Sequence, residues 1–242
     1  MDRIIINNVS KTFKIGIRKN ISALSRILSL FSDRDTKKKI QVLKNISFTA
    51  KEGEVVGIIG KNGSGKSTLL RTIAGIYEKD EGSVKINGRM IPLINLNIGM
   101  QERLTMRDNI FLCCSLLGVE NRMIKQRFNS IVEFSELKEY VNTKVFQFSE
   151  GMKQRLAFAI AIHSNPDILL IDEVFEVGDE KFRTKSSERI KELVKKGTTV
   201  LLVSHSLGMI EKYCDRAIWM DNGMVVKIGS SKEVSSSYLK SS

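Results

Sequence analysis

Short apolar runs separated by polar segments recur along the chain, and their spacing predicts alternating strands and helices. The runs at 54–59, 167–172 and 198–204 are almost entirely apolar, as strands buried on both faces of a parallel sheet are. Helical spacing follows two of these runs, at 69–74 and 179–196. Strands that alternate with helices in this way favour an α/β fold, with a parallel sheet covered on both faces.

Further elements are predicted around this sheet. Thr105 followed by Asp108 is a capping box that begins a helix, and Asn222-Gly223 between two apolar runs is typical of a hairpin. The other predicted elements are strands at 3–9, 40–49 and 82–87 and helices at 105–117, 121–135 and 151–163.

Residues 14–40 form a basic insertion between the first two predicted strands. The net charge is +12, and the segment 10–44 holds ten basic residues against two acidic ones, so this segment carries most of the excess. Such a charge favours an anionic partner, for example nucleic acid, a phosphorylated substrate or a membrane surface. Ile21, Leu24 and Leu28 recur at helical spacing and predict an amphipathic helix, which either docks on its own domain or contacts a membrane partner.

Composition excludes several classes of protein. No stretch approaches the roughly 18 to 20 uncharged apolar residues that a membrane-spanning helix needs, and the N-terminal residues turn polar too soon for a secretory signal. Cys113, Cys114 and Cys214 form neither a zinc pattern nor an even set for disulfides. We therefore expect the chain to work in a reducing cytoplasm.

The stretch GKNGSGKST, residues 60–68, matches the phosphate-binding pattern G-x-x-x-x-G-K-[ST] between a predicted strand and a predicted helix. This pattern predicts that Lys66 reaches the β- and γ-phosphates of ATP and that Ser67 holds Mg²⁺, whereas a glycine-rich turn without a ligand is the alternative. The predicted phosphate-binding residues are Gly60, Lys61, Asn62, Gly63, Ser64, Gly65, Lys66, Ser67 and Thr68.

Two later strands are predicted to bring polar groups to the same place. The strand at 167–172 ends in Asp172 and is followed by Glu173, and the strand at 198–204 is followed by His205. Ligands bind at the carboxyl ends of strands in such sheets. We expect Asp172 to orient Mg²⁺, Glu173 to polarise the attacking water and His205 to donate a hydrogen bond to the γ-phosphate, although a purely structural histidine is the alternative.

Residues 148–155, FSEGMKQR, resemble a divergent form of the ABC signature, whose usual form is Leu-Ser-Gly-Gly-Gln. With the motifs above, the chain resembles the ATP-binding subunit of an ABC transporter along essentially its whole length. The resemblance implies a P-loop NTPase fold with a parallel core sheet, an antiparallel β subdomain and a helical subdomain. It implies one domain over 1–242, with the core and β subdomain at 1–92 and 164–242 and the helical subdomain at 93–163.

The resemblance also implies roles for individual residues. Two copies would pack head to tail, so that Ser149 and Gly151 of one copy contact the γ-phosphate held by Lys66 of the other. Asp179 would lie at the dimer seam. Phe13 would stack on adenine, with a core phenylalanine as the alternative. Gln101 would be the metal-sensing glutamine, although its spacing to the following Leu-Thr is shorter than in common family members.

Three features narrow the resemblance to exporters of bacterial surface polysaccharides such as O-antigens, capsules and teichoic acids. They are the signature variant at 149–152, the sequence DEVFEVGD at 172–179 and the basic insertion. This branch implies a membrane permease dimer as partner, a location at the cytoplasmic face of a prokaryotic membrane and no nucleic acid. The segment 10–44 would contact the membrane surface or a lipid-linked glycan. An exporter ATPase for lipids or drugs is one alternative.

A soluble ABC ATPase acting in translation or DNA repair is a second alternative. Such proteins typically carry two cassettes or large inserted arms, and the sequence shows neither.

Glu150 departs from the glycine or serine that is usual at this position of the signature. We expect its carboxylate to weaken ATP-driven closure, unless it points away from the phosphate or pairs with a cation such as Lys153.

Overall fold

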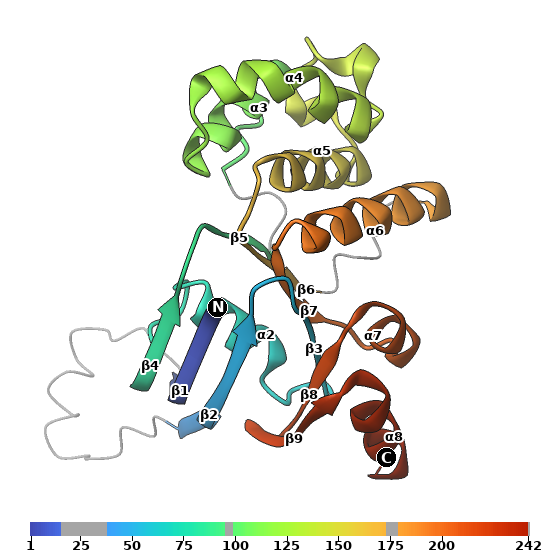
Figure 1. Cartoon of the computed structure of the whole chain (residues 1–242). Coiled ribbons are helices and arrows are strands. Elements are labelled where there is room, and N and C mark those ends of the chain that lie inside the picture. Colours follow the sequence, from blue (N-terminus) through green and yellow to red (C-terminus); the bar gives the residue numbers. More distant parts are fainter. Residues whose placement is uncertain (16–37, 95–98, 173–178, 242) are drawn as a thin grey trace, which may run out of the picture.

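The computed structural model describes residues 1–15, 38–94, 99–172 and 179–241, which form two sheets and a group of helices (Figure 1). The strands are β1 (Asp2–Ile15), β2 (Lys38–Lys51), β3 (Val55–Ile59), β4 (Glu81–Ile86), β5 (Met90–Leu93), β6 (Ile168–Asp172), β7 (Thr199–Val203), β8 (Arg216–Asp221) and β9 (Met224–Ser230). The helices are α2 (Lys66–Ile73), α3 (Met106–Leu116), α4 (Asn121–Ser135), α5 (Glu150–His163), α6 (Glu180–Lys195), α7 (Leu207–Tyr213) and α8 (Ser231–Ser241). Short 3₁₀ turns lie at Lys138–Tyr140 and Val145–Gln147.

The larger sheet has the strand order β5-β6-β7-β3-β8-β9 and confirms the predicted parallel sheet. Strands β5, β6, β7, β3 and β8 are parallel, and β9 returns antiparallel from β8 through the predicted hairpin. The smaller sheet, in the order β2-β1-β4, is antiparallel. The parallel strands point their carboxyl ends to one edge, where the loops that follow them meet.

Two hydrophobic clusters explain why the central strands are apolar at nearly every position. Val200 and Leu202 of β7 pack in the cluster that includes α5 and α6, whereas Leu201 and Val203 pack in the cluster that includes α2 and the smaller sheet. Successive side chains of a strand point to opposite faces, so a sheet covered on both faces needs apolar residues at both. Helices α3, α4 and α5 lie together beyond β5 (Figure 1), and α5 packs in the same hydrophobic cluster as β5.

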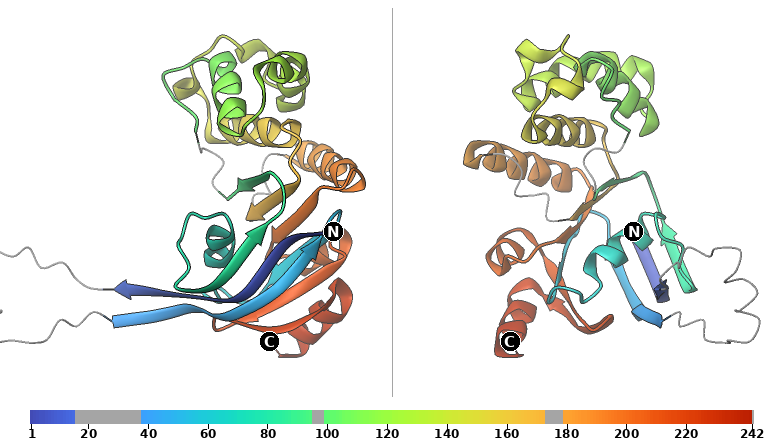
Figure 2. Two further views of the ribbon diagram at one scale, coloured as in Figure 1. Left: turned by 60° about the vertical axis from the view of Figure 1, so that its left-hand side comes forward. Right: turned by 180° about the vertical axis from the view of Figure 1, so that it is seen from behind.

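The structure extends the sequence prediction in two ways. Strands β1 and β2 are longer than the predicted strands at 3–9 and 40–49, and their paired ends at Ile15 and Lys38 project past the rest of the molecule (Figure 2). Elements β5, α7 and α8 were not predicted. The first two are short, and α8 is serine-rich with only Val234 of its apolar residues fully buried, so none of the three has a clear apolar period.

Candidate functional site

The loop between β3 and α2 has a shape that only glycine permits at two positions. Gly60 has φ +150, and a Cβ there would lie 2.1 Å from the Met220 carbonyl oxygen. Gly65 caps α2 with φ +103, and its Cβ would lie 2.9 Å from the Val42 carbonyl oxygen. Glycine lacks this Cβ, so the loop can close tightly before the helix begins. Residues 61–63 are exposed at its tip, whereas Ser64 and Lys66 are buried.

The interior of this loop is suited to an anion. The Lys66 ammonium donates to the carbonyl oxygens of Gly60, at 2.8 Å, and Lys61, at 3.0 Å, so it is held inside the loop. The Ser64 hydroxyl is buried and has no hydrogen-bond partner among the described residues. Thr68 lies in the first turn of α2, whose unpaired N–H groups and positive dipole end also favour an anion.

Ser67 and Asp172 come together as predicted from the sequence. The Ser67 hydroxyl donates to the Asp172 carboxylate at 3.4 Å, although the two residues are far apart in the chain. Asp172 is the last residue of β6 and Ser67 is the second residue of α2, so the sheet and the helix start position them independently. A hydroxyl and a carboxylate are hard oxygen donors of the kind that Mg²⁺ prefers, and the pair fits this cation.

His205 follows β7 at the same edge of the sheet. Its strand lies between β6 and β3, and Asp172 is level with Val203, which precedes His205 by two residues. Val203 is in turn level with Ile58, just before the phosphate-binding loop. His205 is exposed. The predicted catalytic residue Glu173 lies outside the described residues.

Ser149 and Gly151 lie in a different part of the molecule from Lys66. Ser149 caps α5, and its hydroxyl accepts a hydrogen bond from the Met152 N–H at 3.2 Å. Both Ser149 and Gly151 are exposed at this helix start, with N–H groups that have no partner within the helix. Helices α5 and α2 lie well apart in each view (Figures 1 and 2), so one copy of the chain does not bring these two groups together.

The remaining predicted residues have less specific surroundings. Phe13 is half-buried, outside the core, with its ring edge-on to Tyr77 at 5.3 Å. Gln101 is exposed, and its backbone N–H donates to the Asn109 side chain at 2.7 Å. Asp179 caps α6 by accepting from the Phe182 N–H at 2.9 Å. The roles of Phe13, Gln101 and Asp179 stay predictions.

Two polar residues that no sequence pattern marks form hydrogen bonds with the predicted site residues Gln101 and Asp179. Asn109 is fully buried in α3, and its amide also donates to the carbonyl oxygens of Gln101, Leu104 and Thr105, which fixes the turn before the helix. Arg155 links α5 to Asp179 at 2.9 Å. Arg155 is the last residue of the signature-like segment 148–155, but its partner is 24 residues away and no local pattern marks the pair.

Lys153 forms its ion pair with Glu102 rather than with Glu150. Its ammonium lies 2.6 Å from the Glu102 carboxylate, and this hydrogen bond is the main reason that the pKa of Lys153 is raised, with the nearby charge of Glu150 adding less. Glu150 is exposed in the first turn of α5. Its negative charge there interacts favourably with the helix dipole and competes with any phosphate at the same helix start.

We expect that Glu150→Ser does not reduce ATP hydrolysis, because the substitution removes a carboxylate that repels the phosphate. Turnover of the purified chain, measured at saturating ATP, tests this. Glu188→Ser, which removes an exposed carboxylate from α6, is the matched control and should change turnover by less than about twofold. A loss of about tenfold or more in Glu150→Ser alone would show that this carboxylate supports the reaction.

Comparison with known proteins gives consistent matches along the chain. The family model described as ABC transporter matches residues 43–176. The chain is 38% identical over 234 residues to the O-antigen export system ATP-binding protein RfbB of Klebsiella pneumoniae, covering 94% of each chain. It is 41% identical to the protein of the same name from Myxococcus xanthus, of which it spans only 56%, and 38% identical to the teichoic acids export ATP-binding protein TagH of Listeria innocua, of which it spans 69%.

Solved structures confirm the predicted fold class. The dimeric ATP-binding cassette MJ0796, in a post-hydrolysis state bound to ADP and phosphate, superposes with a TM-score of 0.75 at 26% identity, covering 94% of this chain and 98% of that one. A structure described as the ATP-binding subunit of an ABC transporter gives a TM-score of 0.77 at 24% identity, and this likeness supports the fold alone.

Proposed function

Because the chain belongs to the ABC transporter family of ATPases, we propose that it powers the export of a bacterial cell-surface polysaccharide through a separate membrane permease. The observation that carries this proposal is the likeness, over 94% of both chains, to an O-antigen export ATP-binding protein. A teichoic acid export protein is similarly close. The sequence DEVFEVGD at 172–179 and the basic insertion support the same class of substrate.

The proposed reaction is hydrolysis of ATP at the carboxyl edge of the larger sheet. Lys66 and the N–H groups of the loop bind the β- and γ-phosphates, and Ser67 and Asp172 hold Mg²⁺, which neutralises phosphate charge when bound. Glu173 accepts a proton from the attacking water, and His205 donates a hydrogen bond to the γ-phosphate. The hydrogen bond between Ser67 and Asp172 supports these assignments, as does the position of His205 two residues after Val203, which pairs with Asp172 in the sheet.

A second copy of the chain completes the proposed site. The α5 helix start, with Ser149 and Gly151, faces only a γ-phosphate that is bound by another copy, because α5 lies well apart from α2 within one copy (Figure 1). N–H groups at a helix start bind anions well, so ATP would hold the two copies together from both sides. The dimeric cassette of similar fold supports this arrangement.

The basic segment 10–44 is the proposed contact with the membrane surface or with a lipid-linked glycan. Among the described residues, no helix is long and apolar enough to span a membrane. The projecting ends of β1 and β2 carry the exposed residues Lys14, Ile15, Lys38, Lys39 and Ile40 (Figure 2). Exposed lysines beside exposed isoleucines suit an anionic lipid headgroup layer. The predicted amphipathic helix of the insertion lies outside the described residues.

Export in the source organism tests the proposal. We expect that deleting the gene lowers surface polysaccharide by about tenfold or more and that lipid-linked polysaccharide accumulates inside the cell. The wild-type gene should restore export, and a gene carrying Lys66→Met should not. A strain with neutral residues at Lys14, Arg18, Lys19 and Arg26 should export less and bind less to membranes. Unchanged surface polysaccharide, with loss of another exported compound, would favour a lipid or drug exporter.

A further inference from the structure

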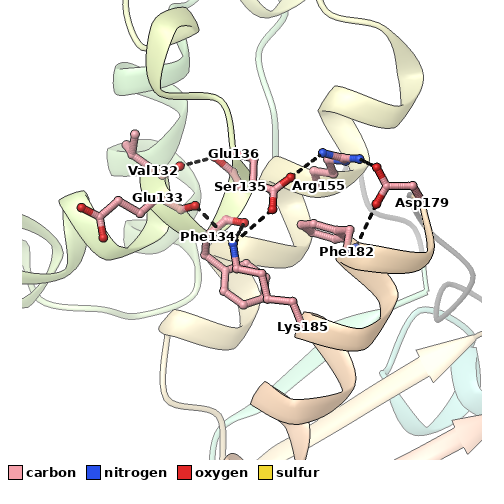
Figure 3. A network of polar contacts seen from close by, with 9 residues as sticks. All are labelled: Val132, Glu133, Phe134, Ser135, Glu136, Arg155, Asp179, Phe182 and Lys185. Carbon is pink, nitrogen blue, oxygen red and sulfur yellow. Dashed lines mark hydrogen bonds and ion pairs between the residues drawn. The ribbon is translucent and has the colours of Figure 1, made fainter.

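Three helices meet at a network of ion pairs and hydrogen bonds (Figure 3). Helix α5 begins after its cap Ser149, α6 begins after its cap Asp179, and α4 is followed by its cap Glu136, which is left-handed with φ 61. Helices α4 and α5 belong to the group beyond β5, whereas α6 connects β6 to β7 in the larger sheet. The network therefore lies where the helical group joins the sheet.

Arg155 is at the centre of this network. One terminal nitrogen of its guanidinium donates to the Glu136 carboxylate at 3.0 Å, and the other donates to the Asp179 carboxylate at 2.9 Å. The guanidinium also lies over the Phe182 ring, 5.0 Å from its centroid. Its side chain is only 21% exposed. A planar guanidinium with fixed donor directions is suited to holding two carboxylates at once.

Asp179 is held through both of its oxygens. One accepts the Phe182 N–H at 2.9 Å and the other accepts Arg155. The Phe182 N–H contributes most to lowering the pKa of Asp179, and the Arg155 hydrogen bond and charge contribute further. The carboxylate therefore stays ionised and fixed at neutral pH.

Lys185 joins the same helices without contacting Asp179. Its ammonium donates to the carbonyl oxygens of Glu133, at 3.3 Å, and Phe134, at 3.1 Å, at the end of α4, and lies 3.5 Å from the Glu136 carboxylate. Below it, the rings of Phe134, Phe158 and Phe182 pack against one another. These contacts join α6 to α4 and α5. In the described part of the chain, the Arg155 ion pair ties Asp179 to the helical group.

We propose that Arg155 is a positioning residue that holds Asp179 at a fixed place relative to the α5 helix start, so that the two move together when two copies close on ATP. Arg155 lies in the same helix as Ser149, about 9 Å further along its axis, and a helix transmits displacement over this distance with little change. The inference rests on the proposed role of the α5 start and of Asp179 at the shared site.

Substitution of Arg155 in the purified full chain tests this proposal. We expect Arg155→Met to lower kcat by about tenfold and to leave KM for ATP, and the affinity of a single copy for a fluorescent ATP analogue, within about twofold. We expect kcat to fall without a change in KM because Arg155 does not line the phosphate-binding loop. Arg155→Lys, which can hold one carboxylate at a time, should give an intermediate kcat.

Lys185→Met is the matched control. It breaks contacts between α6 and α4 in the same network but leaves Arg155 and Asp179 paired, so we expect kcat within about twofold of wild type. If Lys185→Met lowered kcat as much as Arg155→Met, or if Arg155→Met left kcat unchanged, the proposal would be wrong. Thermal unfolding of both variants shows whether any loss follows stability instead.

A double-mutant cycle keeps the proposal testable if Arg155→Met folds poorly. Asp179→Asn keeps an oxygen to cap α6 but weakens the pair with Arg155, so we expect its kcat loss not to add to that of Arg155→Lys. Fully additive losses would contradict the proposed coupling. The cycle does not measure export, so an error in the proposed substrate would leave the kcat of each variant, relative to wild type, unchanged. Failure of the wild-type chain to hydrolyse ATP would contradict the proposed function itself.

Discussion

Lys66→Met is expected to abolish ATP binding and hydrolysis, with a fall in ATP affinity on the order of a hundredfold or more. The Lys66 ammonium is buried and rests on the carbonyl oxygens of Gly60 and Lys61, where it faces the interior of the loop. Methionine keeps the length of the side chain but leaves the triphosphate without the buried Lys66 cation. Removing one partner of a buried charge pair costs about 3 to 5 kcal/mol, and each 1.4 kcal/mol is about tenfold in affinity.

Binding of a fluorescent ATP analogue and steady-state phosphate release measure this effect. Lys79→Met is the control, because Lys79 is an exposed lysine after α2 and its loss should change either quantity by less than about twofold. The circular dichroism spectrum should be the same for both variants. Half of the wild-type affinity retained in Lys66→Met would show that the loop N–H groups alone bind the nucleotide.

The elements around the candidate site were predictable because their causes are local. A strand buried on both faces must be apolar at every position, so β3, β6 and β7 were recognisable from their runs. Parallel strands end at one edge, so the sequence predicts Asp172 near Ser67, and their hydrogen bond confirms this. The ends of β1 and β2 were not predicted, because Lys14, Lys38 and Lys39 interrupt the alternation that marks a half-buried strand.

Polar contacts between distant residues could not be predicted in the same way. The sequence offers Lys153 as one cation that could pair with Glu150, which is close in sequence, but the ion pair of Lys153 is with Glu102, 51 residues away. Arg155 pairs with Glu136 and Asp179 at separations of 19 and 24 residues. Such pairs depend on how helices cross, and neither periodicity nor a local motif determines that crossing. The sequence therefore indicates the phosphate-binding residues but not the network that joins α6 to the helical group.

Glu173→Gln is expected to lower ATP hydrolysis by about a hundredfold or more while ATP binding is retained. Glu173 follows Asp172 at the carboxyl edge and lies outside the described residues, so this expectation comes from its place in the sequence. Glutamine has nearly the same size but cannot accept a proton from the attacking water, whereas Lys66 and the loop N–H groups are unchanged. Since hydrolysis would open the dimer, ATP should then hold two copies of the variant together.

Sedimentation or size-exclusion measurements with ATP and Mg²⁺ separate the two parts of this prediction. The variant should be a dimer with ATP and a monomer with ADP, because the γ-phosphate is the group that Ser149 and Gly151 of the other copy would bind. Glu180→Gln, which removes an exposed carboxylate from the first turn of α6, should hydrolyse ATP within about twofold of the wild-type rate. Turnover of Glu173→Gln at the wild-type rate would refute the assignment of Glu173 as the base. A monomer with bound ATP would refute the shared site instead, and would leave Lys66, Ser67 and Asp172 as a site within one copy.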